Sequence, residues 1–134
     1  PYLESDLDDV IALWELCGLT RPWNNPEIDI FRKLAQRDQL FLLAVKDNQL
    51  IATVMGGYDG HRGWVNYLAV HPNFQRNGVA TALVQQLEKR LIALGCPKLQ
   101  LLIRKDNIDV QSFYEQLGYN EIEVICLGKR LIQD

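Results

Sequence analysis

The sequence predicts a mixed α/β (α+β) fold, in which a central and largely antiparallel sheet carries helices on both faces. Three strand-length segments follow one another across short turns, which is typical of an antiparallel meander. Helical segments come before and after this meander. A long helix connects its last strand to a further strand, and a helical crossover of this kind makes the two strands parallel. The 134 residues fit a single domain over 1–134 that can bury its own core.

The first third of the chain predicts two helices. Apolar residues recur on one helical face over about 7–17, and Gly18 ends this helix. A loop rich in proline and asparagine follows. Asn25 and Pro26 then supply the cap and the first residue of a second helix, which runs to about Arg37.

The remaining elements follow from apolar runs, periodicity and turn residues. The meander strands are predicted at 40–45, 50–55 and 64–70, with a turn at Asp47-Asn48 and an end or bulge of the second strand at Gly56-Gly57. After them come a helix at 79–94, a strand at 99–103, a helix at 107–117 and strand-forming sequence at Tyr119–Ile132, broken near Glu123.

Charge is distributed unevenly along the chain. Residues 1–59 contain ten acidic and five basic side chains, whereas residues 60–105 contain seven basic side chains and one acidic side chain. A positive field in the middle third suits a phosphorylated ligand. The basic residues are too few, and too rarely interleaved with aromatic ones, to indicate nucleic-acid binding.

Several protein classes are excluded by composition. No stretch approaches the ~18 uninterrupted apolar residues of a membrane span, so no membrane partner is expected. The three cysteines, Cys17, Cys96 and Cys126, are scattered and form no metal-binding or disulfide pattern. We therefore expect a cytoplasmic protein without a bound metal.

The loop at 71–81 is the most informative stretch. It joins a predicted strand to a helix N-terminus, where unpaired N–H groups and the helix dipole favour an anion such as phosphate. Arg76 adds a full charge, and Gly78 allows close approach of the backbone to a ligand. The loop has neither the Gly-Lys-Ser/Thr of a P-loop nor the three glycines of a dinucleotide site. On its own it could be an ordinary corner.

A second motif removes that ambiguity. Gln75-Arg76-Asn77-Gly78-Val79-Ala80 has the form Gln/Arg-x-x-Gly-x-Gly/Ala, and Asn107 is followed seven residues later by Tyr114 and then by Gly118-Tyr119. With these motifs the chain resembles the GNAT superfamily of acyl-CoA-dependent N-acyltransferases, and within it the YpeA-type bacterial acetyltransferases. Most of the first strand of that fold is expected to be missing, with Pro1–Leu3 as its tail.

The resemblance implies acetyl-CoA as cosubstrate and a sheet that splays at its middle. Backbone groups of Leu68, Ala69 and Val70 would face the pantetheine, helped by a bulge in that strand. Asn107 and Tyr114 would also contact the cofactor. The residues implied at the pyrophosphate are Gln75, Arg76, Asn77, Gly78, Val79, Ala80 and Thr81.

The resemblance also implies direct transfer of the acetyl group to a primary amine. Tyr114, a phenol with a reference pKa of about 10, would protonate the departing thiolate; the alternative is a core aromatic. Many relatives place a Glu on the strand at 64–70, which here contains no acid. Asp59 and His61 are the candidate bases, unless they only shape a hairpin or water relays the proton.

The acceptor is expected over the two N-terminal helices and their loop. Arg21, Trp23 and Asn24 lie in that loop and are candidate substrate-binding residues, although Trp23 could be a half-buried cap over the sheet. The acidic first part of the chain predicts a cationic acceptor. An amine acceptor, acetyl-CoA and a possible homodimer are the expected partners.

Two other functions fit parts of the sequence. A non-catalytic acyl-CoA-binding regulatory module would explain the missing carboxylate, but not the presence of Tyr114. A nucleotide-phosphate binder would use the same helix N-terminus, but it leaves both Asn107 and Tyr114 unexplained.

Overall fold

The computed structural model describes residues 6–133, which divide into two compact units, the first ending at Leu101 and the second beginning at Leu102. The first unit contains, in order, α1 (Leu7–Leu16), α2 (Pro26–Ala35), β1 (Phe41–Lys46), β2 (Gln49–Tyr58), β3 (Gly63–Val70), the 3₁₀ turn η2 (Pro72–Phe74), α3 (Val79–Ala93) and β4 (Leu99–Leu101). Within the described residues no helix has the length and apolar character needed to cross a membrane. The strand expected at Pro1–Leu3 lies outside the described residues, and the single domain stays a prediction.

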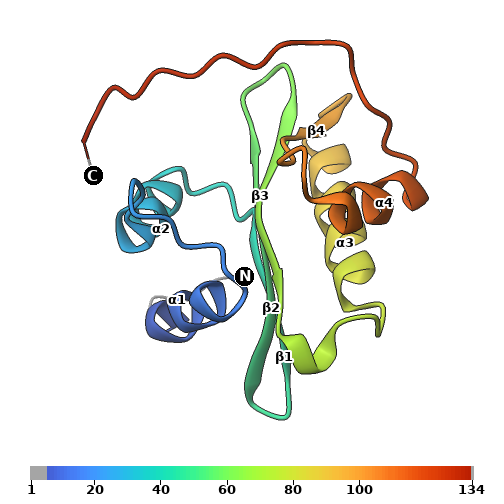
Figure 1. Ribbon diagram of the computed structural model, residues 1–134. Helices are drawn as coiled ribbons and strands as arrows, with labels where there is room; N and C mark the ends of the chain where they lie inside the picture. Colours follow the sequence, from blue (N-terminus) through green and yellow to red (C-terminus); the bar gives the residue numbers. More distant parts are fainter. Residues whose placement is uncertain (1–5, 134) are drawn as a thin grey trace. The chain divides into compact units, whose positions relative to one another are not determined.

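The first unit is built on a sheet with strand order β1-β2-β3-β4. The first two pairs are antiparallel and the last is parallel, as predicted. Asp47 and Asn48 form the β1–β2 turn with φ of 51° and 63°, the left-handed conformation that a tight hairpin turn requires. In Figure 1, α1 and α2 cover one face of β1–β3 and α3 covers the other, which confirms the mixed architecture.

Strand β2 continues through the glycine pair that was expected to end or bulge it. Gly56 pairs with Val65 and Gly57 with Trp64, so the ladder extends to Tyr58. Glycine is required here by packing: a Cβ on Gly56 would lie 2.3 Å from Leu87 Cδ1. The missing side chain lets α3 approach the sheet closely, which the sequence pattern did not reveal.

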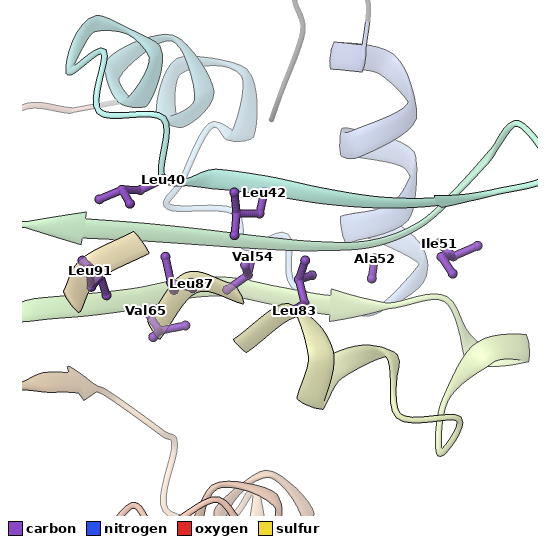
Figure 2. Packing of buried hydrophobic residues seen from close by; sticks show 9 residues of the cluster. All are labelled: Leu40, Leu42, Ile51, Ala52, Val54, Val65, Leu83, Leu87 and Leu91. Atoms are coloured by element: carbon purple, nitrogen blue, oxygen red, sulfur yellow. The ribbon is translucent and has the colours of Figure 1, made fainter. Parts of the chain in front are cut away.

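The main core lies between the sheet and α3. Figure 2 shows nine buried side chains that belong to this cluster and come from the sheet and from α3: Leu40, Leu42, Ile51, Ala52, Val54, Val65, Leu83, Leu87 and Leu91. A second cluster, centred on Trp14, packs α1 and α2 against the opposite face. The α3 residues fall at the helical spacing that the sequence predicts for a core-facing stripe.

The second unit contains one helix, α4 (Ile108–Gln116). Its N-cap is Asn107, whose Oδ1 accepts from Val110 N at 3.4 Å. The strand predicted at Tyr119–Ile132 is wrong, because no residue from Tyr119 to Gln133 belongs to a strand. A strand needs the hydrogen-bonding edge of a partner, and the main-chain bonds described for this segment are local, from Tyr119 N to Tyr114 O and from Val124 N to Ile122 O.

Candidate active site

The loop between β3 and α3 has a backbone shaped by several local contacts. His71 Nδ1 accepts from Asn73 N at 3.1 Å, and this bond opens the turn η2. Arg76 and Gly78 adopt left-handed φ values of 65° and 78°. Gln75 Nε2 donates to Val70 O at 3.1 Å and ties the loop back to the end of β3. Arg76 and Gly78 are both exposed.

Helix α3 starts at this loop without a side-chain cap. Its N-cap is Gly78, and its first turn contains no acidic residue, whereas α2 and α4 are both capped by asparagine oxygens. The helical ladder begins with Ala82 N donating to Gly78 O. The N–H groups of the first turn therefore have no partner within the helix, and their partial positive charge can attract an anion.

Strand β3 changes its partners along its length. Its ladder with β4 covers Gly63–Val65 and stops at the pair Val65↔Leu101, because β4 ends at Leu101. The strand was predicted to continue for two more residues. On the β2 side the register shifts, since Thr53 pairs with Ala69 but Met55 pairs with Asn66. Two β3 residues therefore oppose one of β2. This is the bulge expected in the strand, and it lies beyond the end of the β4 ladder.

Tyr67 occupies the bulge with a left-handed φ of 50°. Its ring stacks on Trp14 with centroids 3.8 Å apart and planes 9° apart. Its hydroxyl donates to Asp29 Oδ2 at 2.6 Å. Burial, and next the hydrogen bond to Asp29, raise the pKa of the Tyr67 phenol, so it stays a donor at neutral pH. This hydrogen bond holds the carboxylate of Asp29, a residue of α2, next to β3.

The residues expected at the pantetheine occupy the part of β3 beyond the β4 ladder. Ala69 is buried, and Leu68 and Val70 are half-buried. The carbonyl of Val70 already accepts from Cys17 Sγ at 3.3 Å and from Gln75 Nε2 at 3.1 Å. Burial raises the pKa of the Cys17 thiol, which favours its donor form.

Asp59 and His61 lie in the β2–β3 hairpin. Asp59 Oδ1 accepts from the backbone N of His61 at 2.8 Å and of Arg62 at 2.7 Å, and Oδ2 accepts from Trp64 Nε1 at 3.3 Å. These bonds, first the one from Arg62, lower the pKa of Asp59. A lowered pKa makes a carboxylate a weaker base, and the geometry agrees with the hairpin-shaping alternative.

The candidate acceptor residues lie between α1 and α2. Arg21 Nη1 donates to the carbonyls of Gly18 and Thr20, so its guanidinium folds back on its own loop. Asn24 N donates to Arg21 O at 3.1 Å. Trp23 is 51% exposed, which leaves half of its surface available for contact with a ligand.

In the second unit, Tyr114 is the buried residue of α4. Its ring makes edge contacts with Phe113 and Tyr119, at centroid distances of 5.0 and 5.3 Å. Burial raises the pKa of the Tyr114 phenol, so it is protonated at neutral pH. The Tyr114 carbonyl also accepts from Tyr119 N, which closes the helix at Gly118.

Comparison with known proteins agrees with this geometry. The profile of the Acetyltransferase (GNAT) family matches residues 8–119, which include both motifs. The chain belongs to the GNAT family of acetyltransferases. An acetyltransferase of Pectobacterium atrosepticum is 53% identical over 133 residues, covering 99% of this chain and 94% of that protein. This GNAT chain is therefore an acetyltransferase, while its YpeA-type assignment stays a prediction.

Solved structures share the fold of this GNAT chain. The ribosomal-protein-S18-alanine N-acetyltransferase of Escherichia coli matches with a TM-score of 0.75 and 23% identity, over 90% of this chain and 76% of that one. AAC(6')-Iy in complex with the bisubstrate analogue CoA-S-monomethyl-acetylneamine matches with a TM-score of 0.75 and 17% identity, over 96% and 94%.

Sequence reasoning missed Asp29 and the residues that position Tyr67. Asp29 lies 38 positions from its partner, and an acid in the first turn of a helix is already explained by the helix dipole. Thr53 and Trp14 fit an ordinary strand and an ordinary apolar helix face. The sequence signal that was present is Tyr67 itself, a bulky aromatic in a strand from which the expected acid is absent.

Proposed function

We propose that this acetyltransferase uses acetyl-CoA and transfers the acetyl group directly to a primary amine of a cationic acceptor. The observation that carries the proposal is the uncapped start of α3 directly after the left-handed Arg76 and Gly78. This arrangement suits the pyrophosphate of CoA, and the GNAT family assignment favours an enzyme over a regulatory module or a nucleotide binder.

The cofactor would lie along the last part of β3. Backbone N–H groups from Arg76 to Thr81 would bind the pyrophosphate, and the pantetheine would satisfy backbone groups of Leu68–Val70 where β4 has ended. The carbonyl of Val70 already accepts from two donors within the chain. The pantetheine would therefore bind mainly to the N–H of Val70 and to the backbone N–H and C=O of Leu68. By the family resemblance, Asn107 is a further candidate for binding the cofactor.

The proposed reaction has one covalent exchange. The ammonium group loses a proton, and the free amine attacks the thioester carbonyl, forming a C–N bond and a tetrahedral intermediate. Collapse breaks the C–S bond, and the CoA thiolate receives a proton from Tyr114. The nitrogen then gives up its second proton, which restores the Tyr114 phenol through solvent. The hydrogen bonds that Asp59 accepts lower its pKa and make it a weaker base. The candidate acceptors for the proton of the amine are therefore His61 and a relay of water molecules. Proximity supplies much of the rate.

An acceptor panel tests this proposal. We expect heat of binding with acetyl-CoA and CoA but not with ATP, and release of CoA thiol with spermidine, an aminoglycoside, lysine or a peptide with a free N-terminus. The acidic first part of the chain favours these cations. Binding of ATP alone would contradict the cofactor assignment. Reaction with taurine or glutamate, but with none of the cations, would contradict the charge argument.

Gly78→Ala should weaken acetyl-CoA binding about tenfold and destabilise the protein by about 1 kcal/mol. The reason is backbone strain, since an alanine at φ 78° costs about 1–2 kcal/mol although a Cβ there meets no atom within 4 Å. Calorimetry with acetyl-CoA and denaturant titration measure the two effects. Gly128→Ala is the matched control, because its Cβ also meets nothing and its φ is not left-handed. Equal affinities of the two variants would contradict the role of Gly78.

A further inference from the structure

Asp29 has one oxygen bound and one without a hydrogen-bond donor. Its Oδ2 accepts from the Tyr67 hydroxyl at 2.6 Å. Among residues 6–133, no donor contacts Oδ1. The residue is half-buried on the face of the sheet that α1 and α2 cover. A half-buried carboxylate with an unmatched oxygen favours a donor that arrives from outside the chain.

Tyr67 holds this carboxylate in a fixed orientation. Its ring lies against Trp14, and its carbonyl accepts from Thr53 Oγ1 at 3.0 Å. Thr53 Oγ1 in turn accepts from Trp14 Nε1 at 2.9 Å, and both Trp14 and Thr53 are fully buried. These contacts hold both the ring and the backbone of Tyr67 in place, and its hydroxyl donates to Asp29. The Asp29 carboxylate is therefore preorganised as an acceptor.

The basic side chain one turn from Asp29 in α2 is already paired. Lys33 Nζ lies 2.6 Å from Asp38 Oδ2. The surrounding part of the chain, residues 1–59, has ten acidic and five basic side chains. The field at Asp29 consequently favours a cation.

The position of Tyr67 places Asp29 toward the acyl end of the proposed cofactor path. The pyrophosphate loop follows the end of β3 at Val70, and Tyr67 comes three residues earlier. At about 3.3 Å per residue, this is about 10 Å from Val70 along the strand. The bulge also marks the region where the β4 ladder has ended.

A carboxylate that pairs with the reacting amine without removing its proton hinders the reaction. An opposite charge stabilises the ammonium form of an amine, and the ammonium form cannot attack the thioester. The same contact is productive when it binds a different ammonium group of the acceptor, because it orients the free amine without protecting it from deprotonation.

We propose that Asp29, oriented by Tyr67, binds a second, non-reacting ammonium group of the acceptor, so that diamines and polyamines are preferred over monoamines. This inference rests on the proposed function and narrows its acceptor class. Tyr67 acts in it as a positioning residue. The ligand donates an N⁺–H to Asp29 Oδ1, the oxygen that no described residue contacts.

The test compares spermidine with n-butylamine in the wild type and three variants. Asp29→Asn should lower the ratio of kcat/KM for spermidine to kcat/KM for n-butylamine about 10–100-fold, mainly through the KM for spermidine, since a charge-assisted bond is lost. Tyr67→Phe keeps the carboxylate but removes its orientation, so the spermidine KM should rise about 3–10-fold with kcat unchanged. Acetyl-CoA affinity, measured by calorimetry, should not change in either variant.

Glu27→Gln is the matched control. It removes the same charge from the same first turn of α2, but Glu27 is exposed, so the ratio should stay within about twofold of the wild type. If Asp29→Asn retains the wild-type ratio while the wild type acetylates amines, this inference is wrong and the proposed function stands. If the wild type acetylates no amine, both are wrong. If Asp29→Asn does not fold, an unchanged ratio in Tyr67→Phe overturns the inference.

Discussion

Tyr114→Phe is expected to lower kcat about 10²–10⁴-fold, the range typical of losing a general acid. The change removes only the hydroxyl, so the edge contacts of the ring with Phe113 and Tyr119 remain. Burial raises the pKa of the phenol, so the hydroxyl keeps its proton at neutral pH but is also a weaker acid. Burial also disfavours the thiolate that leaves, which makes protonation in this setting worth more than in water. Release of CoA thiol at saturating acetyl-CoA and amine measures the effect.

Tyr119→Phe provides the control for this prediction. It removes a phenol of the same kind from the ring that contacts Tyr114, but from a half-buried residue beyond the end of α4. Its kcat should stay within about threefold of the wild type. Equal rates for wild type and Tyr114→Phe would show that Tyr114 is a packing residue and that water protonates the thiolate.

Leu87→Ala should lower the free energy of unfolding by about 2–5 kcal/mol, the usual cost of deleting buried methyl groups. Leu87 is fully buried, and its side chain fills the space left by the absent Cβ of Gly56. Truncation therefore opens a cavity between β2 and α3 beside Gly56. Denaturant titration followed by circular dichroism measures the change.

Ile92→Ala tests whether burial, and not helix composition, causes that loss. Ile92 lies in the same helix but is 71% exposed. Because alanine has the better helix propensity, this variant should remain within about 0.5 kcal/mol of the wild type. A similar loss in both variants would contradict the core assignment of Leu87.

Local signals predicted most of the first unit. The turn at Asp47-Asn48, the cap at Asn25 and the apolar stripe of α3 each act within a few residues, so the sequence shows them directly. The passage of β2 through Gly56 was not visible, because it depends on the distance between sheet and helix. The strand predicted at Tyr119–Ile132 failed for a related reason, since β propensity does not supply a partner edge.

The candidate site divides in the same way. The loop at Arg76 and Gly78 was predicted because a short motif encodes its conformation. The bulge was expected from the family resemblance, but its occupant and the carboxylate beside it were not. The contact between Asp29 and Tyr67 joins a helix to a distant strand, and no spacing in the sequence relates the two. Tertiary packing alone creates it.

The backbone of Tyr67 has a consequence for how this protein tolerates change. A left-handed conformation costs a residue with a Cβ about 1–2 kcal/mol, and glycine would adopt it without that penalty. Glycine would remove that strain, but it would also lose the stacking on Trp14 and the bond to Asp29. The strain at position 67 is therefore offset by contacts that the tyrosine side chain makes, and both glycine and smaller side chains are expected to destabilise the bulge.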